Sequence, residues 1–249
     1  MRDRSSDIAV LEGEPRYKPA IHNGYWPNDI VTNGLVLNLP LHRYSGSRFK
    51  SVDPYQHLFT KTGALWTPDG DLLDGIDDKI ESLNVAVLNI TTAITVEVYL
   101  NPDAVNPANY GRYLDFIDDA GPGGSFHSYA LGMEGTDETN VRWDLTGVSV
   151  LNSGLGAVTP GVLNHIAGAY DKNAGANNNK IIVNGVQVAS ETQIASITSK
   201  PNGVLRIGGH TGGGQYWKGL FCLARIYNRA LTIQEVRHNR DVTRWRYGV

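Results

Sequence analysis

Short segments in which apolar and polar residues alternate run through this chain from about residue 34 onward. Between Ile94 and Leu100, apolar side chains at every second position alternate with Thr95, Glu97 and Tyr99. A period of two is typical of a strand that buries one face. Similar short segments lie at 34–41, 141–145, 165–170, 180–190, 204–207 and 219–231. The pattern predicts an all-β protein.

Turn and cap signals divide the last third of the chain into elements. Val183-Asn184-Gly185-Val186 predicts a two-residue hairpin, because a type I′ turn needs positive φ at both central residues. Thr232-x-x-Glu235 is a capping box, which satisfies two free amides at the start of a helix. We therefore predict one short helix from Thr232 to about Arg240.

Composition limits the classes of protein to be considered. A chain of 249 residues with a 41% hydrophobic fraction can bury one large β core. No apolar run approaches the ~18 residues of a membrane-spanning helix, so we expect no membrane insertion. The net charge of −3 argues against nucleic acid as a partner. Cys222 is the only cysteine, and its apolar strand predicts a small buried side chain.

Residues 1–33 differ from the rest, and we assign them to an extended N-terminal arm that precedes a sandwich domain at 34–249. Three prolines favour extended backbone there. Tyr17, Tyr25 and Trp26 are the side chains that we expect to contact a neighbouring chain. The first residues carry no apolar secretory signal, so we expect cytoplasmic synthesis.

Four segments occur in an order that resembles the laminin-G-like branch of the concanavalin A-like lectin/glucanase superfamily. They are Gly34–Leu41 (GLVLNLPL), Leu73–Ile80 (LDGIDDKI), Ile94–Pro102 (ITVEVYLNP) and Gly219–Leu231, which ends in IYNRAL. The resemblance implies a two-sheet antiparallel jelly-roll sandwich, here with an N-terminal arm and one C-terminal helix.

Enzymes of this superfamily raise the question of glycoside hydrolysis, which needs two carboxylates ~5–9.5 Å apart. Hydrolases with this fold carry a Glu-x-Asp-x-x-Glu strand, and this sequence has none. The nearest alternatives are Glu97, isolated on its strand, and the pair Asp137-Glu138 in a polar turn. The seven histidines show no spacing typical of a zinc site. We expect no enzymatic activity.

The resemblance also implies at most one structural calcium ion. Asp53 and Asp78 could supply carboxylates. The acidic pair that the family places before its Arg-Ile-Tyr-Asn segment is replaced here by Cys222-Leu223. The alternative is that Asp77 and Asp78 only shape the turn before their strand.

Aromatic side chains are the candidates for ligand binding, because sugar rings stack on them. Tyr129, Tyr216 and Trp217 lie in strands or beside the glycine-rich loop at 212–214. The alternative is that they fill the core, which is the function we expect of Trp143.

These observations favour a non-catalytic structural and binding module displayed on a large assembly. A phage virion decoration or appendage protein fits best, with the sandwich at the virion surface and a glycan as its candidate ligand. The arm would bind further copies of this chain or capsid proteins. The alternatives are a free lectin-like carbohydrate-binding module and, less favoured, a glycoside hydrolase or polysaccharide lyase.

Overall fold

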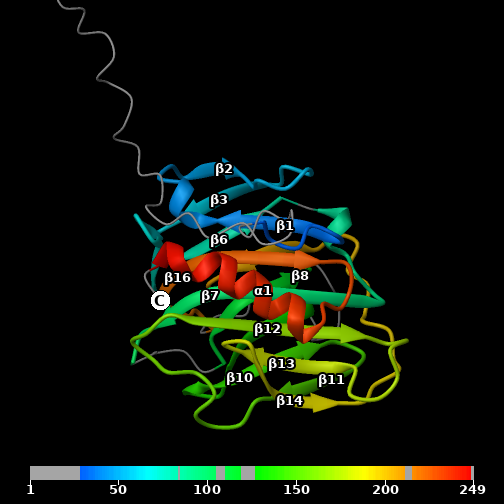
Figure 1. The fold of residues 1–249 in the computed structure, drawn as a ribbon. Helices are drawn as coiled ribbons and strands as arrows, with labels where there is room; N and C mark the ends of the chain where they lie inside the picture. Colours follow the sequence, from blue (N-terminus) through cyan, green and yellow to red (C-terminus); the bar gives the residue numbers. More distant parts are fainter. Residues whose placement is uncertain (1–28, 84, 105–109, 119–126, 211–214, 248–249) are drawn as a thin grey trace, which may run out of the picture.

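Two antiparallel β-sheets of eight strands each form a sandwich in the computed structural model (Figure 1), which describes residues 29–83, 85–104, 110–118, 127–210 and 215–247. The all-β prediction and the jelly-roll architecture are confirmed. Tyr17, Tyr25 and Trp26 lie outside the described residues.

The first sheet has the strand order β14-β13-β12-β7-β16-β5-β4, and β1 pairs with β16 beyond the end of β5. Its strands are β1 (Leu35–Pro40), β4 (Leu65–Thr67), β5 (Gly70–Asp74), β7 (Ala93–Pro102), β12 (Asn164–Asp171), β13 (Asn179–Val183), β14 (Val186–Glu191) and β16 (Lys218–Tyr227).

The second sheet has the strand order β11-β10-β9-β8-β15-β6-β3-β2. Its strands are β2 (Arg48–Lys50), β3 (Leu58–Thr62), β6 (Lys79–Ser82), β8 (Arg112–Ile117), β9 (His127–Glu134), β10 (Asp137–Leu145), β11 (Ser149–Asn152) and β15 (Val204–Ile207). The described residues also form three short 3-10 helices: η1 (Leu41–Arg43), η2 (Ala86–Leu88) and η3 (Trp245–Tyr247).

The local signals form as predicted. Asn184 and Gly185 have φ of 51° and 80° in the turn that joins β13 to β14. The Thr232–Glu235 capping box is present at the start of α1 (Ile233–Arg244), which runs four residues beyond the predicted end. Among the described residues, no helix has the length and apolar character needed to cross a bilayer.

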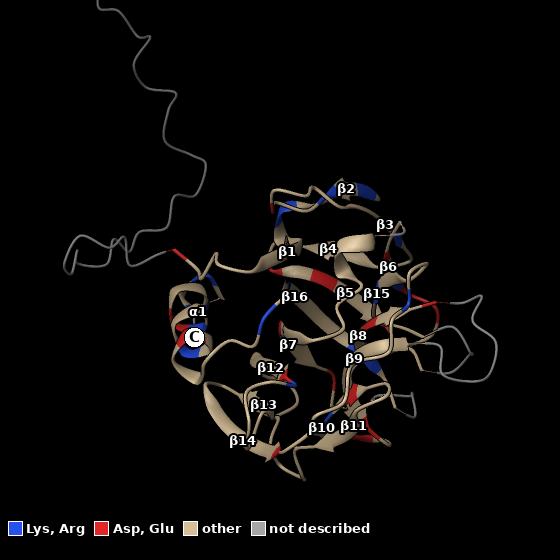
Figure 2. Ribbon diagram, turned by 90° about the vertical axis from the view of Figure 1, so that its right-hand side faces the viewer, with Lys and Arg blue, Asp and Glu red and all other residues tan. Residues whose placement is uncertain are grey.

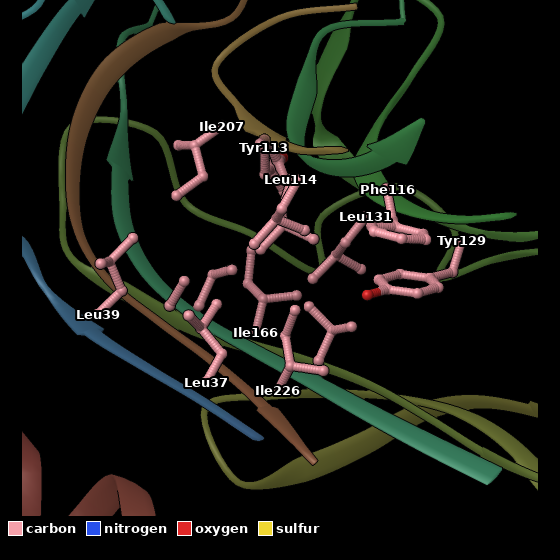
Figure 3. Packing of buried hydrophobic residues seen from close by; sticks show 14 of the residues in the cluster. Leu37, Leu39, Tyr113, Leu114, Phe116, Tyr129, Leu131, Ile166, Ile207 and Ile226 are labelled. Carbon is pink, nitrogen blue, oxygen red and sulfur yellow. The ribbon is translucent and has the colours of Figure 1, made fainter. Parts of the chain in front are cut away.

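The inner faces of the two sheets enclose the main apolar core (Figure 3). Trp143 of β10 is fully buried, and its indole Nε1 donates to Asn179 Oδ1 on the opposite sheet at 3.0 Å. Its ring occupies the space above Gly168 of β12, where an added Cβ would lie 2.4 Å from the ring. The predicted core position of Trp143 is confirmed. Cys222 is also buried, as predicted.

Helix α1 lies across the outer face of the first sheet (Figures 1 and 2). Beneath it, Asn239 of α1 donates to Glu97 of β7 at 2.9 Å, while Arg225 Nη1 and His165 Nε2 approach the same carboxylate to 3.8 and 3.7 Å. Glu97 is 1% exposed, and this burial raises the pKa of its carboxyl to about 7 despite the positive charge of Arg225.

The last residues of the predicted arm are held by α1 and the turn before it. The amide of Val31 donates to Asn239 Oδ1 at 2.8 Å, and His238 Nε2 donates to the Asp29 carbonyl at 2.7 Å. Arg229 Nε donates to the Asn33 carbonyl at 2.8 Å. The chain therefore enters the described structure on the helix-covered side of the sandwich.

Replacing Gly168 with alanine should destabilise the protein by about 1–3 kcal/mol, because the new methyl group collides with the Trp143 ring. Urea denaturation measures the change. Gly46→Ala is the control, since a Cβ there would come no closer than 3.9 Å to its nearest neighbour. Equal stabilities for the two variants would contradict the packing described for the Trp143 ring.

Replacing Glu97 with glutamine should change how stability depends on pH. The folded-state pKa of Glu97 is raised from 4.5 to about 7. The contribution of Glu97 to the free energy of unfolding is therefore fully present below about pH 4.5, and it is lost as the pH rises through 7. Relative to Glu97→Gln, the wild-type free energy of unfolding should fall across this window by up to about 3 kcal/mol. Denaturation at several pH values measures the difference, and a constant difference would contradict the assignment.

Candidate functional site

The outer face of the second sheet carries two rows of charged side chains separated by small residues. Arg112 of β8 and Arg142 of β10 both pair with Gly132 of β9, which lies between them. In the next row, Asp115 and Asp144 both pair with Ala130 in the same way. Because side chains alternate along a strand, these residues point away from the core that Leu131 and Trp143 help to form.

Gly132 makes room for this arrangement. A Cβ at Gly132 would lie 3.4 Å from Arg112 Cδ and 2.6 Å from the carbonyl oxygen of Gly111. The Arg112 side chain can therefore pass close over β9. Blue and red segments lie on the second sheet in Figure 2, on the side of the molecule away from α1.

Asp144 is held by two positive side chains and one imidazole. Arg142 donates to its Oδ2 from Nη2 at 2.8 Å and from Nε at 3.2 Å, and Arg112 Nη2 lies 3.8 Å away. His127 Nε2 approaches Oδ1 to 3.1 Å. Burial alone would raise the pKa of Asp144, but the contacts and charges of His127 and Arg142 outweigh it and lower the pKa to about 2. Asp144 is therefore ionised at neutral pH.

Asp115 has a different environment. Its side chain is fully buried, and Oδ2 lies 2.6 Å from His210 Nδ1. The other carboxylate oxygen, Oδ1, is buried without a hydrogen-bond partner. His210 in turn packs edge-on against His127, with ring centroids 6.1 Å apart. We call Arg112, Asp115, His127, Arg142, Asp144 and His210 the charged cluster.

The charged cluster borders a cavity and two aromatic rings. His127, Arg142 and Asp144 line an open cavity of about 520 Å³ together with the turn that joins β10 to β11. The Arg142 guanidinium lies 5.4 Å from the centroid of the Tyr110 ring. Tyr216 is partly exposed and packs on Gly209, next to His210. Of the predicted ligand-binding residues, Tyr216 is thus at the edge of this face.

Two of the predicted ligand-binding residues lie in the core instead. Tyr129 is fully buried, stacks on Phe116 at 5.2 Å and donates to the Leu88 carbonyl (Figure 3). Trp217 is also fully buried, against Tyr113 and Phe221. The prediction that they bind a ligand at the surface is wrong, because both rings point between the sheets, where no sugar can reach them.

The two residues predicted for calcium take part in different sets of contacts. Both oxygens of Asp53 accept backbone amides, from Asn38 at 3.0 Å and Tyr55 at 2.9 Å. Asp78 groups with Asp74 and Asp77, and its Oδ2 accepts the Asp74 amide at 2.8 Å. These contacts shape turns, and a calcium ion held by Asp53 and Asp78 stays a prediction.

The acids considered for hydrolysis are also separated. Glu97 lies beneath α1 on the first sheet. At the start of β10, Asp137 accepts from Thr139 at 2.7 Å, and Glu138 accepts from the buried Trp217 indole at 3.4 Å. None of these three carboxylates belongs to the charged cluster.

Sequence reasoning did not find the charged cluster. Apolar and charged residues alternate in Val141–Leu145 (VRWDL). This pattern could have indicated that Arg142 and Asp144 face away from Trp143. The meeting of β8, β9, β10 and the segment at His210 depends on strand order, which no local pattern shows.

Comparison with known proteins places this architecture in a family. Residues 74–237 match the laminin-G-like family of the concanavalin A-like lectin/glucanases superfamily. The chain belongs to this superfamily. No match was found among curated proteins.

Several solved structures share this superfamily fold at low sequence identity. Trypanosoma rangeli sialidase aligns with 86% of the chain at 18% identity and a TM-score of 0.64, and the chain spans 34% of the sialidase. Domain 4 of the extracellular arabinanase AbnA from Geobacillus stearothermophilus, in complex with arabinotriose, aligns with 84% of the chain at 15% identity and a TM-score of 0.57, and 97% of that domain is covered. The botulinum neurotoxin serotype G binding domain aligns with 82% of the chain at 15% identity and a TM-score of 0.61, with 50% of that domain covered. These similarities show the lectin-like jelly-roll fold.

Proposed function

We propose that this protein is a non-catalytic carbohydrate-binding module, and that the charged cluster on the outer face of the second sheet holds the glycan. The observation that carries this proposal is the pair of rows Arg112–Gly132–Arg142 and Asp115–Ala130–Asp144. Because Gly132 lets Arg112 pass over β9 toward Asp144, these rows place guanidinium and carboxylate groups side by side on one face.

Buried polar atoms without hydrogen-bond partners support the proposal. Arg112 Nε and Nη1 and Asp115 Oδ1 are buried without hydrogen-bond partners. Buried polar atoms in native proteins almost always have a partner, so such atoms call for a ligand or an ordered water. Guanidinium donors and carboxylate acceptors suit the hydroxyl groups of a sugar, each of which both donates and accepts. Tyr110 and Tyr216 add rings at the edge of the cluster.

The charge state of the cluster favours binding over catalysis. A glycosidase needs a carboxylic acid with a raised pKa to protonate the leaving oxygen. The low pKa of Asp144 makes it unsuited to that function. The arabinanase domain solved with arabinotriose is a relative of nearly the same extent as this chain, which also fits a module with a binding function.

Replacing Arg142 or Arg112 with alanine should weaken glycan binding at least about tenfold. Each variant lacks a guanidinium and therefore the charge-assisted hydrogen bonds that this group would donate to the sugar. A glycan array would identify the ligand, and calorimetry on that ligand would measure the loss. Arg48→Ala is the matched control, since Arg48 is an exposed arginine at the far edge of the same sheet.

Two results would contradict this part of the proposal. The first is equal binding by Arg48→Ala and the two cluster variants, which would move the glycan elsewhere on the molecule. The second is release of new reducing ends or unsaturated products from a bound glycan, which would show that the protein is an enzyme.

We further propose that the module is displayed on a large assembly, of which a phage virion is the example we favour, and that residues 1–28 attach it. The support is the position at which the chain enters the sandwich. Asp29 and Val31 bond to α1 on the outer face of the first sheet. The charged cluster lies on the outer face of the second sheet, so attachment and glycan binding would use opposite sides (Figure 2).

Deleting residues 1–28 should abolish assembly and leave the sandwich folded, because the bond from Val31 to Asn239 is kept. Light scattering on untagged material would measure the particle mass, and circular dichroism would report the fold. We expect the full chain to migrate with a megadalton particle and the deletion variant to migrate alone. A full-length chain that is monomeric under the same conditions would contradict display on an assembly.

A further inference from the structure

We propose that Asp115, His127 and His210 form a binding site for a divalent transition-metal ion, with Zn²⁺ as the ion that fits best. This inference goes beyond glycan binding and does not depend on it. The three side chains come from β8, from the first residue of β9 and from the segment after β15.

The three residues can reach a common ion. One potential ligand atom from each lies within 4.8 Å of the other two. Zinc bonds of about 2.0–2.2 Å to nitrogen and oxygen place tetrahedral ligand atoms roughly 3.3 Å apart. Small side-chain rotations therefore suffice to close the group on a metal.

Asp115 gives an independent reason to expect a cation. Its carboxylate is fully buried, and Oδ1 has no hydrogen-bond partner. A buried carboxylate normally has a full set of partners or a counter-ion, because removing a charge from water is costly. A metal ion beside Asp115 would supply both the missing contact and the missing charge.

The neighbouring arginines do not oppose a cation here, because each faces an acid. Arg142 binds Asp144 and Glu134, and Arg206 binds Glu81. Arg112 faces Asp144. Asp115 contacts His210 instead of an arginine, and an imidazole can also ligate a metal.

The ligand chemistry selects the class of metal. Two imidazoles and one carboxylate suit zinc and other late first-row ions. Calcium prefers six to eight oxygen ligands, which this set does not offer. Three protein ligands also leave a coordination position for water, as in zinc sites that exchange ligands.

Asp144 is placed to orient one of the ligands. It is not part of the three-residue group, yet its Oδ1 lies 3.1 Å from His127 Nε2. Arg142 fixes Asp144 in turn. A carboxylate that contacts the second nitrogen of a metal-binding histidine fixes the orientation of the ring. We therefore assign Asp144 as a positioning residue.

The site is open to an incoming ion. The side chains of His127 and His210 are 14% and 11% exposed, and His127 lines the 520 Å³ cavity beside β10. An ion can therefore enter from solvent without opening the sandwich.

Isothermal titration of the metal-free full-length protein with Zn²⁺ tests the site, and we expect one ion per chain. His127→Ala, His210→Ala and Asp115→Asn should each weaken binding by more than about 100-fold, and Asp144→Asn by about 10–100-fold. His238→Ala is the matched control, because His238 lies on α1 at the opposite face. Circular dichroism of each metal-free variant checks that it folds. If Asp115→Asn does not fold, the His127 and His210 variants are enough to test the site.

Three outcomes would overturn the proposal. They are no Zn²⁺ binding by the wild type, unchanged binding by the His127 and His210 variants, and an equal loss in His238→Ala. Glycan binding is measured separately on metal-free protein. A protein that binds the glycan but not Zn²⁺ would refute this site alone, and a protein that binds Zn²⁺ but no glycan would refute the proposed function alone.

Discussion

The contact between Trp143 and Gly168 joins the two sheets, from β10 of one sheet to β12 of the other. The indole ring lies where a side chain on β12 would otherwise be, and its Nε1 reaches Asn179 on the same opposite sheet. Because Trp143 must point inward, Arg142 and Asp144 on either side of it must point outward. A single packing contact in the core therefore decides which face of β10 carries charge.

The two outer faces show why buried charge has different consequences on each sheet. On the first sheet, α1 covers Glu97, and Asn239 from the helix binds that carboxylate. On the second sheet, Asp144 lines an open cavity, and Asp144 and Asp115 each contact a partly exposed histidine. A charged side chain covered by a helix affects stability through its shifted pKa. A charged side chain that a solute can reach is able to bind a ligand.

Local chemistry predicted much of the fold and little of the site. The Asn184-Gly185 turn and the Thr232 cap depend on neighbouring residues, so the sequence alone located them. Tyr129 was misplaced because an aromatic ring in an alternating strand suits either face until its partner sheet is known. His127 and His210 are 83 positions apart (210 minus 127), and only the placement of β15 beside β8 brings their segments together. No spacing rule for zinc ligands covers such a distance.

The balance of charge around β9 links the two proposals for the second sheet. Arg112 and Arg142 face Asp144, and Arg142 also binds Glu134, so these groups nearly neutralise one another. Asp115 stands outside this network, with an imidazole in place of an arginine. Neutral hydroxyl groups of a sugar suit Arg112 and Arg142, whose charges are offset by acids. A cation suits the Asp115 carboxylate, which contacts the imidazole of His210. Ala130 and Gly132 put no long side chain on β9 between these groups, and Asp115 Oδ1 is the one atom that both proposals use.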